Sequence, residues 1–294
     1  MEQKDGLKRK AGILPGMECF QKNGAEYLTF PAISRTGMVS HLMTMRAGGV
    51  SEGDLRSMNL SFSRGDKREN VEENFRRTAA LLGCRPEDIV CSDQTHTTNI
   101  RRVTAADKGK GVVRPKDYTD VDGLITDEPG IALATFYADC VPLLFVDPVR
   151  RAVGLSHSGW RGTAQGMGAR TAEAMKEAFG SRTEDLLVGI GPSICRDCYE
   201  VSEDVAEAFR ELFSRADFQG LSVRLSDVLF DKGNGKYQLD LWKVNQAVCL
   251  SAGVRPEHIS MTDVCTCCNP DRLFSHRASG GKRGNLGMFV MLLP

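Results

Sequence analysis

The chain has 294 residues, of which 41% are hydrophobic and 26% are charged, and its formal net charge at pH 7 is zero. This composition is typical of a soluble globular protein, and a neutral chain carries no overall electrostatic attraction to nucleic acid or to a membrane surface. We therefore expect neither nucleic acid nor membrane as a partner. No linker rich in Pro, Gly or Ser divides the sequence, so we predict a single domain over residues 1–294, with a weakly patterned N-terminal segment over 1–37.

The N-terminal residues and the cysteines predict the redox environment of the chain. The first ten residues contain no apolar run of the kind that marks a secretory signal, and the chain has ten cysteines. Cysteines in a chain without an export signal are expected to be thiols or ligands rather than disulfides. We predict a cytoplasmic location. The sequence carries no signal for a particular oligomeric state.

Hydrophobic patterning predicts short strands mixed with amphipathic helices. The expected strands, in chain order, cover residues 38–45, 89–91, 100–103, 131–136, 142–146, 152–156, 186–190, 259–262 and 286–292. The expected helices cover residues 67–82, a segment that begins near 163, and residues 203–213 and 240–251. Strands and helices do not alternate strictly, so we predict an α+β fold with a mixed β-sheet core flanked by helices.

Two residues near the ends of expected strands carry the strongest chemical signal. Cys140 follows the 131–136 strand, and His157 follows the 152–156 strand. His96 comes shortly after the 89–91 strand, and the whole chain has only five histidines. A thiolate and two imidazoles suit zinc with one coordination position left open, as in catalytic zinc sites. The sequence by itself leaves two alternatives, namely packing of Cys140 in the core and a metal-free Cys–His nucleophile pair.

The residues around this pair extend the predicted site. Asp139 lies inside an apolar run, where an ionisable group needs a partner. After His157, Gly159 and Gly162 permit close backbone approach, and Thr163 is a good N-cap for the next helix. A helix N-terminus together with Arg161 predicts an oxyanion or phosphate pocket; the alternative is a tight turn with a solvated arginine.

A second group of cysteines invites a structural zinc site. Cys195 and Cys198 form a Cys-x2-Cys pair, and Cys265, Cys267 and Cys268 lie close together later in the chain. We interpret the later group as lacking the usual two-residue spacer. On that basis these cysteines are expected to be packing or incidental residues.

Short motifs follow one another in order along most of the chain. They are Arg46-Ala47-Gly48-Gly49-Val50-Ser51, Asn59-Leu60-Ser61, Gly65-Asp66, Gln94-Thr95-His96, Asp122-Gly123-Leu124-Ile125-Thr126, Ala138-Asp139-Cys140-Val141-Pro142, His157-Ser158-Gly159-Trp160-Arg161-Gly162-Thr163, Gly189-Ile190-Gly191-Pro192-Ser193-Ile194, Tyr199-Glu200-Val201, Leu239-Asp240-Leu241, Cys265-Thr266 and Phe274-Ser275-His276-Arg277. Together these motifs resemble the multicopper polyphenol oxidase (laccase-like) family, also described as a purine nucleoside phosphorylase and peptidoglycan editing factor family. Two positions depart from the family pattern, because Thr97 replaces a frequent Gly and Ser158 replaces a usual Ala.

The resemblance implies a single α+β domain in which His96, Cys140 and His157 bind zinc. It further implies phosphorolysis of adenosine, inosine and methylthioadenosine to the free base and (methylthio)ribose 1-phosphate, together with adenosine deamination. Purine nucleosides and phosphate are then the expected partners. Cys140, Asp139 and Arg161 are expected to be catalytic. The residues expected to bind substrate are Arg46, Asn59, Gln94, Arg161, Gly162 and Thr163.

Three other functions remain open. The family's older name suggests copper-dependent oxidation of polyphenols, and copper can compete for the same ligands. A chain with five histidines and no His-x-His pair nevertheless lacks the ligands of a multicopper cluster. A metal-free Cys–His hydrolase acting on cell-wall precursors is a further alternative, and a metal-binding regulatory protein without catalytic activity is another.

Overall fold

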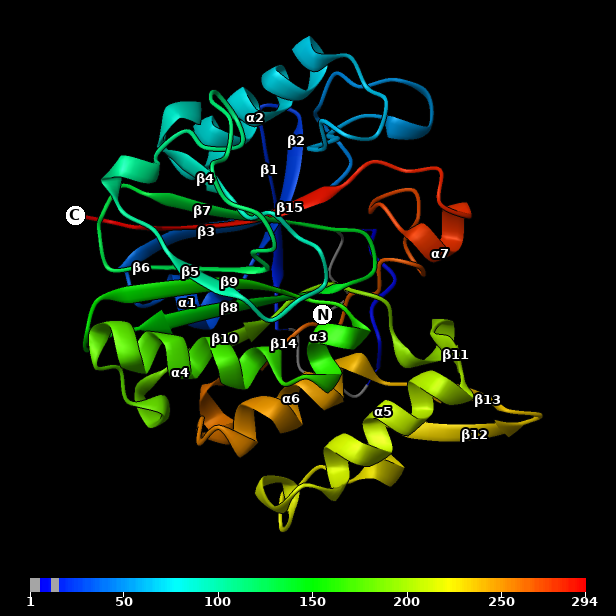
Figure 1. Ribbon diagram of the computed structural model, residues 1–294. Helices are drawn as coiled ribbons and strands as arrows, with labels where there is room; N and C mark the ends of the chain where they lie inside the picture. Colours follow the sequence, from blue (N-terminus) through cyan, green and yellow to red (C-terminus); the bar gives the residue numbers. More distant parts are fainter. Residues whose placement is uncertain (1–5, 12–15) are drawn as a thin grey trace.

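Two six-stranded sheets stacked face to face form the centre of the protein. The computed structural model describes residues 6–11 and 16–294 (Figure 1). The first sheet has the order β1-β2-β3-β15-β7-β4, and the second has the order β14-β10-β8-β9-β6-β5. A three-stranded sheet, β11-β13-β12, extends from one end of the molecule. Both large sheets mix parallel and antiparallel pairs, so the predicted α+β fold with a mixed sheet core is confirmed.

The strands have the following bounds. Those of the first sheet are β1 (Glu18–Lys22), β2 (Ala25–Thr29), β3 (Val39–Thr44), β15 (Leu286–Leu292), β7 (Ala132–Tyr137) and β4 (Ile89–Cys91). Those of the second are β14 (Ile259–Met261), β10 (Leu187–Ile190), β8 (Val141–Asp147), β9 (Ala152–Ser158), β6 (Gly123–Thr126) and β5 (Ile100–Arg102). The small sheet contains β11 (Glu200–Ser202), β12 (Leu229–Gly233) and β13 (Lys236–Leu239).

Three of the helices cover the outer faces of the two large sheets. The bounds of all the helices are α1 (Pro31–Ser34), α2 (Arg68–Leu82), α3 (Trp160–Ala164), α4 (Met167–Phe179), α5 (Glu203–Ser214), α6 (Leu241–Ser251) and α7 (His276–Ser279). Helix α2 packs on the first sheet, whereas α4 and α6 pack on the second (Figure 1). Within the described residues, no helix combines the length and apolar character needed to cross a bilayer.

Three apolar layers follow from this stacking. The layer between the two sheets contains side chains from strands such as β3, β8, β9 and β15 and is almost fully buried. Both faces of the central strands are covered, so β8, β9 and β15 are buried along their whole length. This explains why the sequence shows them as continuous apolar runs rather than as alternating patterns.

The structure differs from the sequence prediction around Thr163. We predicted this residue as the N-cap of a helix, but it lies inside the short helix α3. The break comes at Gly166, whose φ of 78° is left-handed, and Gly166 is the N-cap of α4. The hydroxyl of Thr163 is buried and bonds Ser158 Oγ at 2.8 Å and Asn245 Nδ2 at 3.1 Å.

The N-terminal segment contains more structure than its weak pattern suggested. Strands β1 and β2 form a hairpin at the edge of the first sheet. Its two turn residues, Asn23 and Gly24, have positive φ angles of 53° and 79°. An Asn-Gly pair is a strong sequence signal for such a hairpin. The same signal, Asn234-Gly235, joins β12 to β13.

Buried His41 should make folding sensitive to mild acid. Its Nε2 accepts the backbone N–H of Phe30 at 2.9 Å, and burial lowers the pKa of His41 to about 4. In the unfolded chain the pKa of a histidine is about 6.5. As the pH falls from this pKa toward the folded pKa, His41 gains a proton in the unfolded chain but not in the folded one, so the free energy of unfolding decreases. We expect His41 to account for a loss of about 2 kcal/mol in the free energy of unfolding between pH 7.5 and pH 5.

Urea unfolding of the wild type and of His41→Gln at both pH values measures this effect. The glutamine amide oxygen can still accept the Phe30 N–H but cannot titrate. The variant should therefore lose less stability than the wild type on acidification. An equal loss in both proteins would show that His41 is not responsible.

Candidate active site

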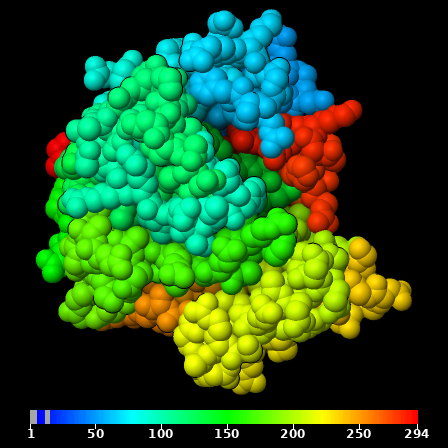
Figure 2. Space-filling view, viewed as in Figure 1, coloured from blue at the N-terminus to red at the C-terminus, as the bar shows by residue number. Residues whose placement is uncertain are grey.

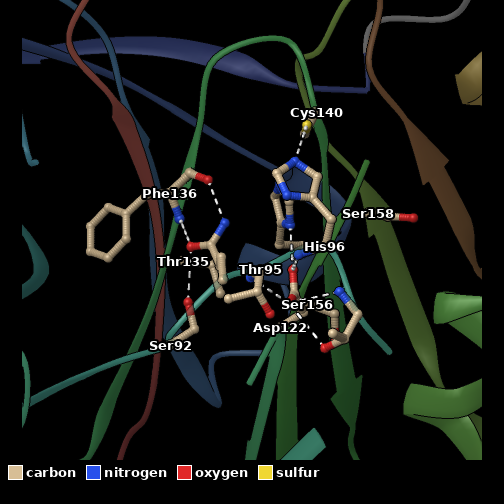
Figure 3. Close-up of polar contacts among 12 residues, drawn as sticks. Ser92, Thr95, His96, Asp122, Thr135, Phe136, Cys140, Ser156 and Ser158 are labelled. Carbon is tan, nitrogen blue, oxygen red and sulfur yellow. Dashed lines mark hydrogen bonds and ion pairs between the residues drawn. The ribbon is translucent and has the colours of Figure 1, made fainter. Parts of the chain in front are cut away.

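Three side chains from separate parts of the chain meet at one end of the stacked sheets. His96 lies in the loop after β4, Cys140 lies in the link from β7 to β8, and His157 lies near the end of β9. One ligand atom from each lies within 4.8 Å of the other two, and Cys140 Sγ is 3.9 Å from His96 Nε2 (Figure 3). The link from β7 to β8 crosses from the first sheet to the second, so the stacking of the sheets brings these residues together.

Asp122 organises this cluster. Its carboxylate is fully buried and accepts the backbone N–H groups of Thr95, His96 and Thr97 at 2.9–3.1 Å (Figure 3). The same carboxylate bonds His157 Nδ1 at 2.7 Å. With Nδ1 engaged, the Nε2 atom of His157 is left to bind a metal, as in carboxylate–histidine–metal arrangements.

Cys140 and His157 form a thiolate–imidazolium pair, in which a bound metal ion would take the place of the ring proton on His157. Burial opposes ionisation of the thiol, but His157 and His96 outweigh it and lower the pKa of Cys140 to about 6. Burial likewise opposes protonation of His157, whereas the Cys140 thiolate and Asp122 raise the pKa of its ring to about 9. A cation beside the sulfur therefore favours the thiolate. A thiolate with two imidazole nitrogens is a donor set that fits zinc or copper.

Gly159 is required by the close packing of the ligands. A Cβ atom at this position would come within 2.9 Å of His96 Cδ2 and 3.2 Å of Cys140 Sγ. The predicted close backbone approach at Gly159 is thus confirmed. At Gly162 the nearest atom to such a Cβ, Thr97 O, would be at an ordinary 3.5 Å.

Asp139 positions the loop that carries Cys140. One of its carboxylate oxygens accepts the Thr266 hydroxyl at 2.6 Å, and the other accepts the Arg277 backbone N–H at 2.7 Å. Its φ of 87° is left-handed, which is uncommon for a residue other than glycine. These contacts hold a strained backbone conformation next to Cys140, so the structure gives Asp139 the partners that its burial requires.

A cavity of about 470 Å³ opens over the ligand cluster. Figure 2 shows it as a hollow between the segment around residues 92–116 and the C-terminal segment that includes Arg283. Its walls combine aromatic and cationic side chains, among them Phe62, Phe136, Arg64 and Arg283. Its volume falls within the usual range for small-molecule sites.

The two arginines form a cationic region in this cavity. Burial together with the positive charge of Arg64 lowers the pKa of Arg283 to about 10, so the Arg283 guanidinium is still charged at pH 7. The Arg283 Nε atom is buried and has no hydrogen-bond partner among the described residues. Two neighbouring guanidinium groups, one of them with an unused Nε donor, suit an anion such as phosphate.

The remaining predicted substrate residues lie in different surroundings. Gln94 lines the cavity, but its amide is engaged by the backbone of Phe136 and by Ser92 (Figure 3). Asn59 is buried under the rim and holds the backbone N–H groups of Ser61 and Asn285. These two residues shape the cavity wall.

Arg46 and the α3 residues lie outside the cavity lining. Arg46 donates to the carbonyl oxygens of Arg56 and Pro270 and stacks over Phe274. The guanidinium of Arg161 lies 4.3 Å from the ring centroid of Trp160. The cavity lining instead contains residues that the sequence reasoning gave no role, notably Arg64 and Arg283. The sequence reasoning likewise assigned no function to Asp122, although this residue directly precedes the buried strand β6.

The fold and the site define an α+β protein with a candidate metal centre of two histidines and one cysteine. Comparison with known proteins identifies its family. Residues 40–293 match the family described as multi-copper polyphenol oxidoreductase laccase, and the chain belongs to this family. It is 36% identical to purine nucleoside phosphorylase YlmD of Geobacillus stearothermophilus over 93% of this chain and 97% of that protein. It is also 34% identical to a purine nucleoside phosphorylase of Bacteroides thetaiotaomicron, over 90% of this chain and 96% of that one.

Solved structures agree with this assignment. The crystal structure of YlmD from Geobacillus stearothermophilus superposes with a TM-score of 0.85 and 33% identity, covering 96% of this chain and 100% of that chain. The hypothetical protein YfiH of Bacillus licheniformis gives a TM-score of 0.86 and 31% identity, covering 95% of this chain and 100% of that one. The predicted family resemblance is therefore confirmed.

Replacing Asp122 should weaken metal binding at the cluster of His96, Cys140 and His157. Asp122→Asn keeps the size of the side chain but removes the charge that orients His157. Loss of a carboxylate that bonds a metal-bound histidine typically lowers the metal affinity by about 10–100-fold. We expect a loss of this size in zinc affinity, measured by competition with a chromophoric chelator.

Asp120→Asn is the matched control for this variant. Asp120 lies two positions earlier, its side chain is exposed, and its positive φ of 55° is one that asparagine tolerates. This variant should bind zinc as the wild type does. Equal affinities in Asp122→Asn and Asp120→Asn would contradict the role given to Asp122.

Proposed function

We propose that the protein is a zinc-dependent purine nucleoside phosphorylase. Its substrates would be adenosine, inosine and methylthioadenosine, and its products the free base and ribose 1-phosphate or methylthioribose 1-phosphate. Adenosine deamination would be a second activity. The observation that best supports this proposal is the joint presence, in one cavity, of the His96, Cys140 and His157 ligand set and the cationic pair Arg64 and Arg283. The names of the relatives as purine nucleoside phosphorylases point the same way.

The cavity residues divide between the two substrates by their chemistry. Phe62 and Phe136 offer faces and edges on which a purine ring can stack. Arg64 and Arg283 would hold phosphate through charge-assisted hydrogen bonds. In phosphorolysis a phosphate oxygen bonds to ribose C1′ while the C1′–N9 bond breaks and its electron pair leaves with the base. Holding both reactants in one cavity makes this step effectively unimolecular.

His96, Cys140 and His157 would hold the zinc ion. When bound, zinc supplies Lewis acidity at the open end of the ligand set. Asp122 fixes the His157 tautomer through Nδ1, and Asp139 fixes the backbone that presents Cys140. In the part of the chain that the structure describes, a single group of candidate ligands contains histidine. Its three ligands suit one metal ion, which favours this activity over multicopper oxidation of phenols.

The direct test is incubation of purified protein of known metal content with adenosine, with and without phosphate. We expect adenine and ribose 1-phosphate to form only when phosphate is present, and the amount of inosine formed measures deamination. Cys140→Ala should lose the metal ion of this three-ligand cluster and, with it, turnover. A lack of turnover of any purine nucleoside by zinc-loaded wild-type protein would contradict the proposal and direct attention to the Cys–His hydrolase alternative.

The assignment of phosphate to the two cavity arginines can be tested separately. Arg64→Ala and Arg283→Ala should each raise the KM for phosphate by about 10–100-fold, because a hydrogen bond to a charged group contributes about 1.5–3 kcal/mol. The KM for the nucleoside should change much less. Steady-state kinetics with phosphate as the varied substrate gives both values.

Arg161→Ala is the informative comparison, since Arg161 with Gly162 and Thr163 was the phosphate site expected from sequence. With phosphate on Arg64 and Arg283, Arg161→Ala keeps the wild-type KM for phosphate. If Arg161→Ala alone raised the KM for phosphate, the phosphate site would be at α3 and not at Arg64 and Arg283.

A further inference from the structure

Four cysteines outside the candidate active site meet at a single point. Cys195 is the N-cap and Cys198 the last residue of a short 3-10 helix before β11, and Cys265 and Cys268 lie in the segment that follows β14. Their four sulfur atoms all lie within 4.8 Å of one another. The expectation that the later group lacks a two-residue spacer is wrong, because Thr266 and Cys267 separate Cys265 from Cys268. Both pairs therefore have the Cys-x2-Cys spacing. Cys195 and Cys265 do pack with Trp242, as expected of packing residues.

The distances between the sulfur atoms suit a single tetrahedral ion. Cys268 Sγ is 3.5 Å from Cys198 Sγ and 4.0 Å from Cys195 Sγ. Four sulfurs at the usual zinc–sulfur distance of about 2.3 Å form a tetrahedron with edges of about 3.8 Å. All four cysteines are free thiols rather than disulfides.

The surroundings of the sulfur atoms also suit thiolates. The backbone N–H groups of Cys195 and Cys268 donate to Cys265 Sγ at 3.2 and 3.4 Å. Such bonds to sulfur stabilise negative charge. Four thiolates with a divalent ion carry two negative charges in total. Lys10 interacts with Cys195 and forms an ion pair with Asp197 at 3.0 Å, so it places a positive charge beside the cluster.

We propose that Cys195, Cys198, Cys265 and Cys268 form a closed structural site for one divalent metal ion of the zinc class. Four sulfur ligands leave no open position, so this site has no catalytic chemistry of its own. It differs in this respect from the three-ligand cluster of His96, Cys140 and His157. The proposal depends only on the four thiols and stands whether or not the protein is a nucleoside phosphorylase.

The place of this site in the fold gives it a second consequence. Thr266, between the two cysteines of the second pair, donates its hydroxyl to Asp139. Ile194, directly before Cys195, donates its backbone N–H to the Asp139 carbonyl oxygen at 3.0 Å. Both cysteine-bearing segments therefore form hydrogen bonds to Asp139, the residue that precedes Cys140. An ion that joins the two segments would hold the Cys140 loop in position from outside the active site.

Metal analysis of variants purified under reducing conditions from zinc-supplemented culture tests the proposal. The wild type should contain about two zinc ions per chain, one for each cluster. Cys195→Ser/Cys268→Ser should lose one of them. Cys267→Ser is the matched control, because Cys267 lies in the same segment but outside the four-sulfur group, and it should keep both.

A measurement on protein with all four cysteines intact covers the case in which the double serine variant fails to fold. His96→Ala/His157→Ala removes two ligands of the other cluster and should retain one metal ion. After replacement of zinc by cobalt, that protein should show the intense visible absorption and sulfur-to-metal charge-transfer bands of four thiolate ligands. A His96→Ala/His157→Ala protein without bound metal, or a cobalt spectrum without these bands, would overturn the proposal. So would equal metal contents in folded Cys195→Ser/Cys268→Ser and Cys267→Ser.

Discussion

The candidate active site depends above all on one buried carboxylate, that of Asp122. A fully buried charge is costly unless hydrogen bonds satisfy it. Here three successive backbone N–H groups of residues 95–97 and the ring of His157 do so. The same bonds that stabilise the carboxylate set the path of the His96 loop and the orientation of the His157 ring. Two of the three candidate metal ligands are therefore held by a single side chain.

The stacked sheets supply the frame for this arrangement. Asp122 directly precedes the first residue of β6, and His157 is the second-last residue of β9. These two strands are antiparallel neighbours in the second sheet. Cys140 lies where the chain passes from β7 in the first sheet to β8 in the second. Since the layer between the sheets is closely packed and almost fully buried, the relative positions of these strand ends have little freedom. A cavity lined by aromatic and cationic side chains then lies over a fixed set of donors.

Much of this could be predicted from the sequence, for identifiable physical reasons. The central strands were recognisable because burial on both faces leaves continuous apolar runs. The convergence of His96, Cys140 and His157 was predictable because each follows or ends such a run. The hairpins at Asn23-Gly24 and Asn234-Gly235 were missed although both carry a turn signal, because the first strand of each hairpin is largely exposed and lacks a strong apolar pattern.

Other parts depended on three-dimensional contacts. Asp122 accepts bonds from a loop more than twenty residues away, and nothing near it in the sequence marks those partners. Arg64 and Arg283 lie far apart in the chain and meet only in the cavity. The four-cysteine cluster, by contrast, could have been recognised from sequence, because its two pairs have the same spacing. The identity of the metal and the substrate remains a prediction.

The most direct test of the central arrangement is a crystal structure of the purified protein with anomalous diffraction recorded on both sides of the zinc absorption edge. We predict an anomalous peak within bonding distance of His96, Cys140 Sγ and His157 Nε2, with Asp122 bonded to His157 Nδ1 behind it. A zinc-loaded crystal without a peak at these three residues, or with His157 turned away from Asp122, would contradict the account.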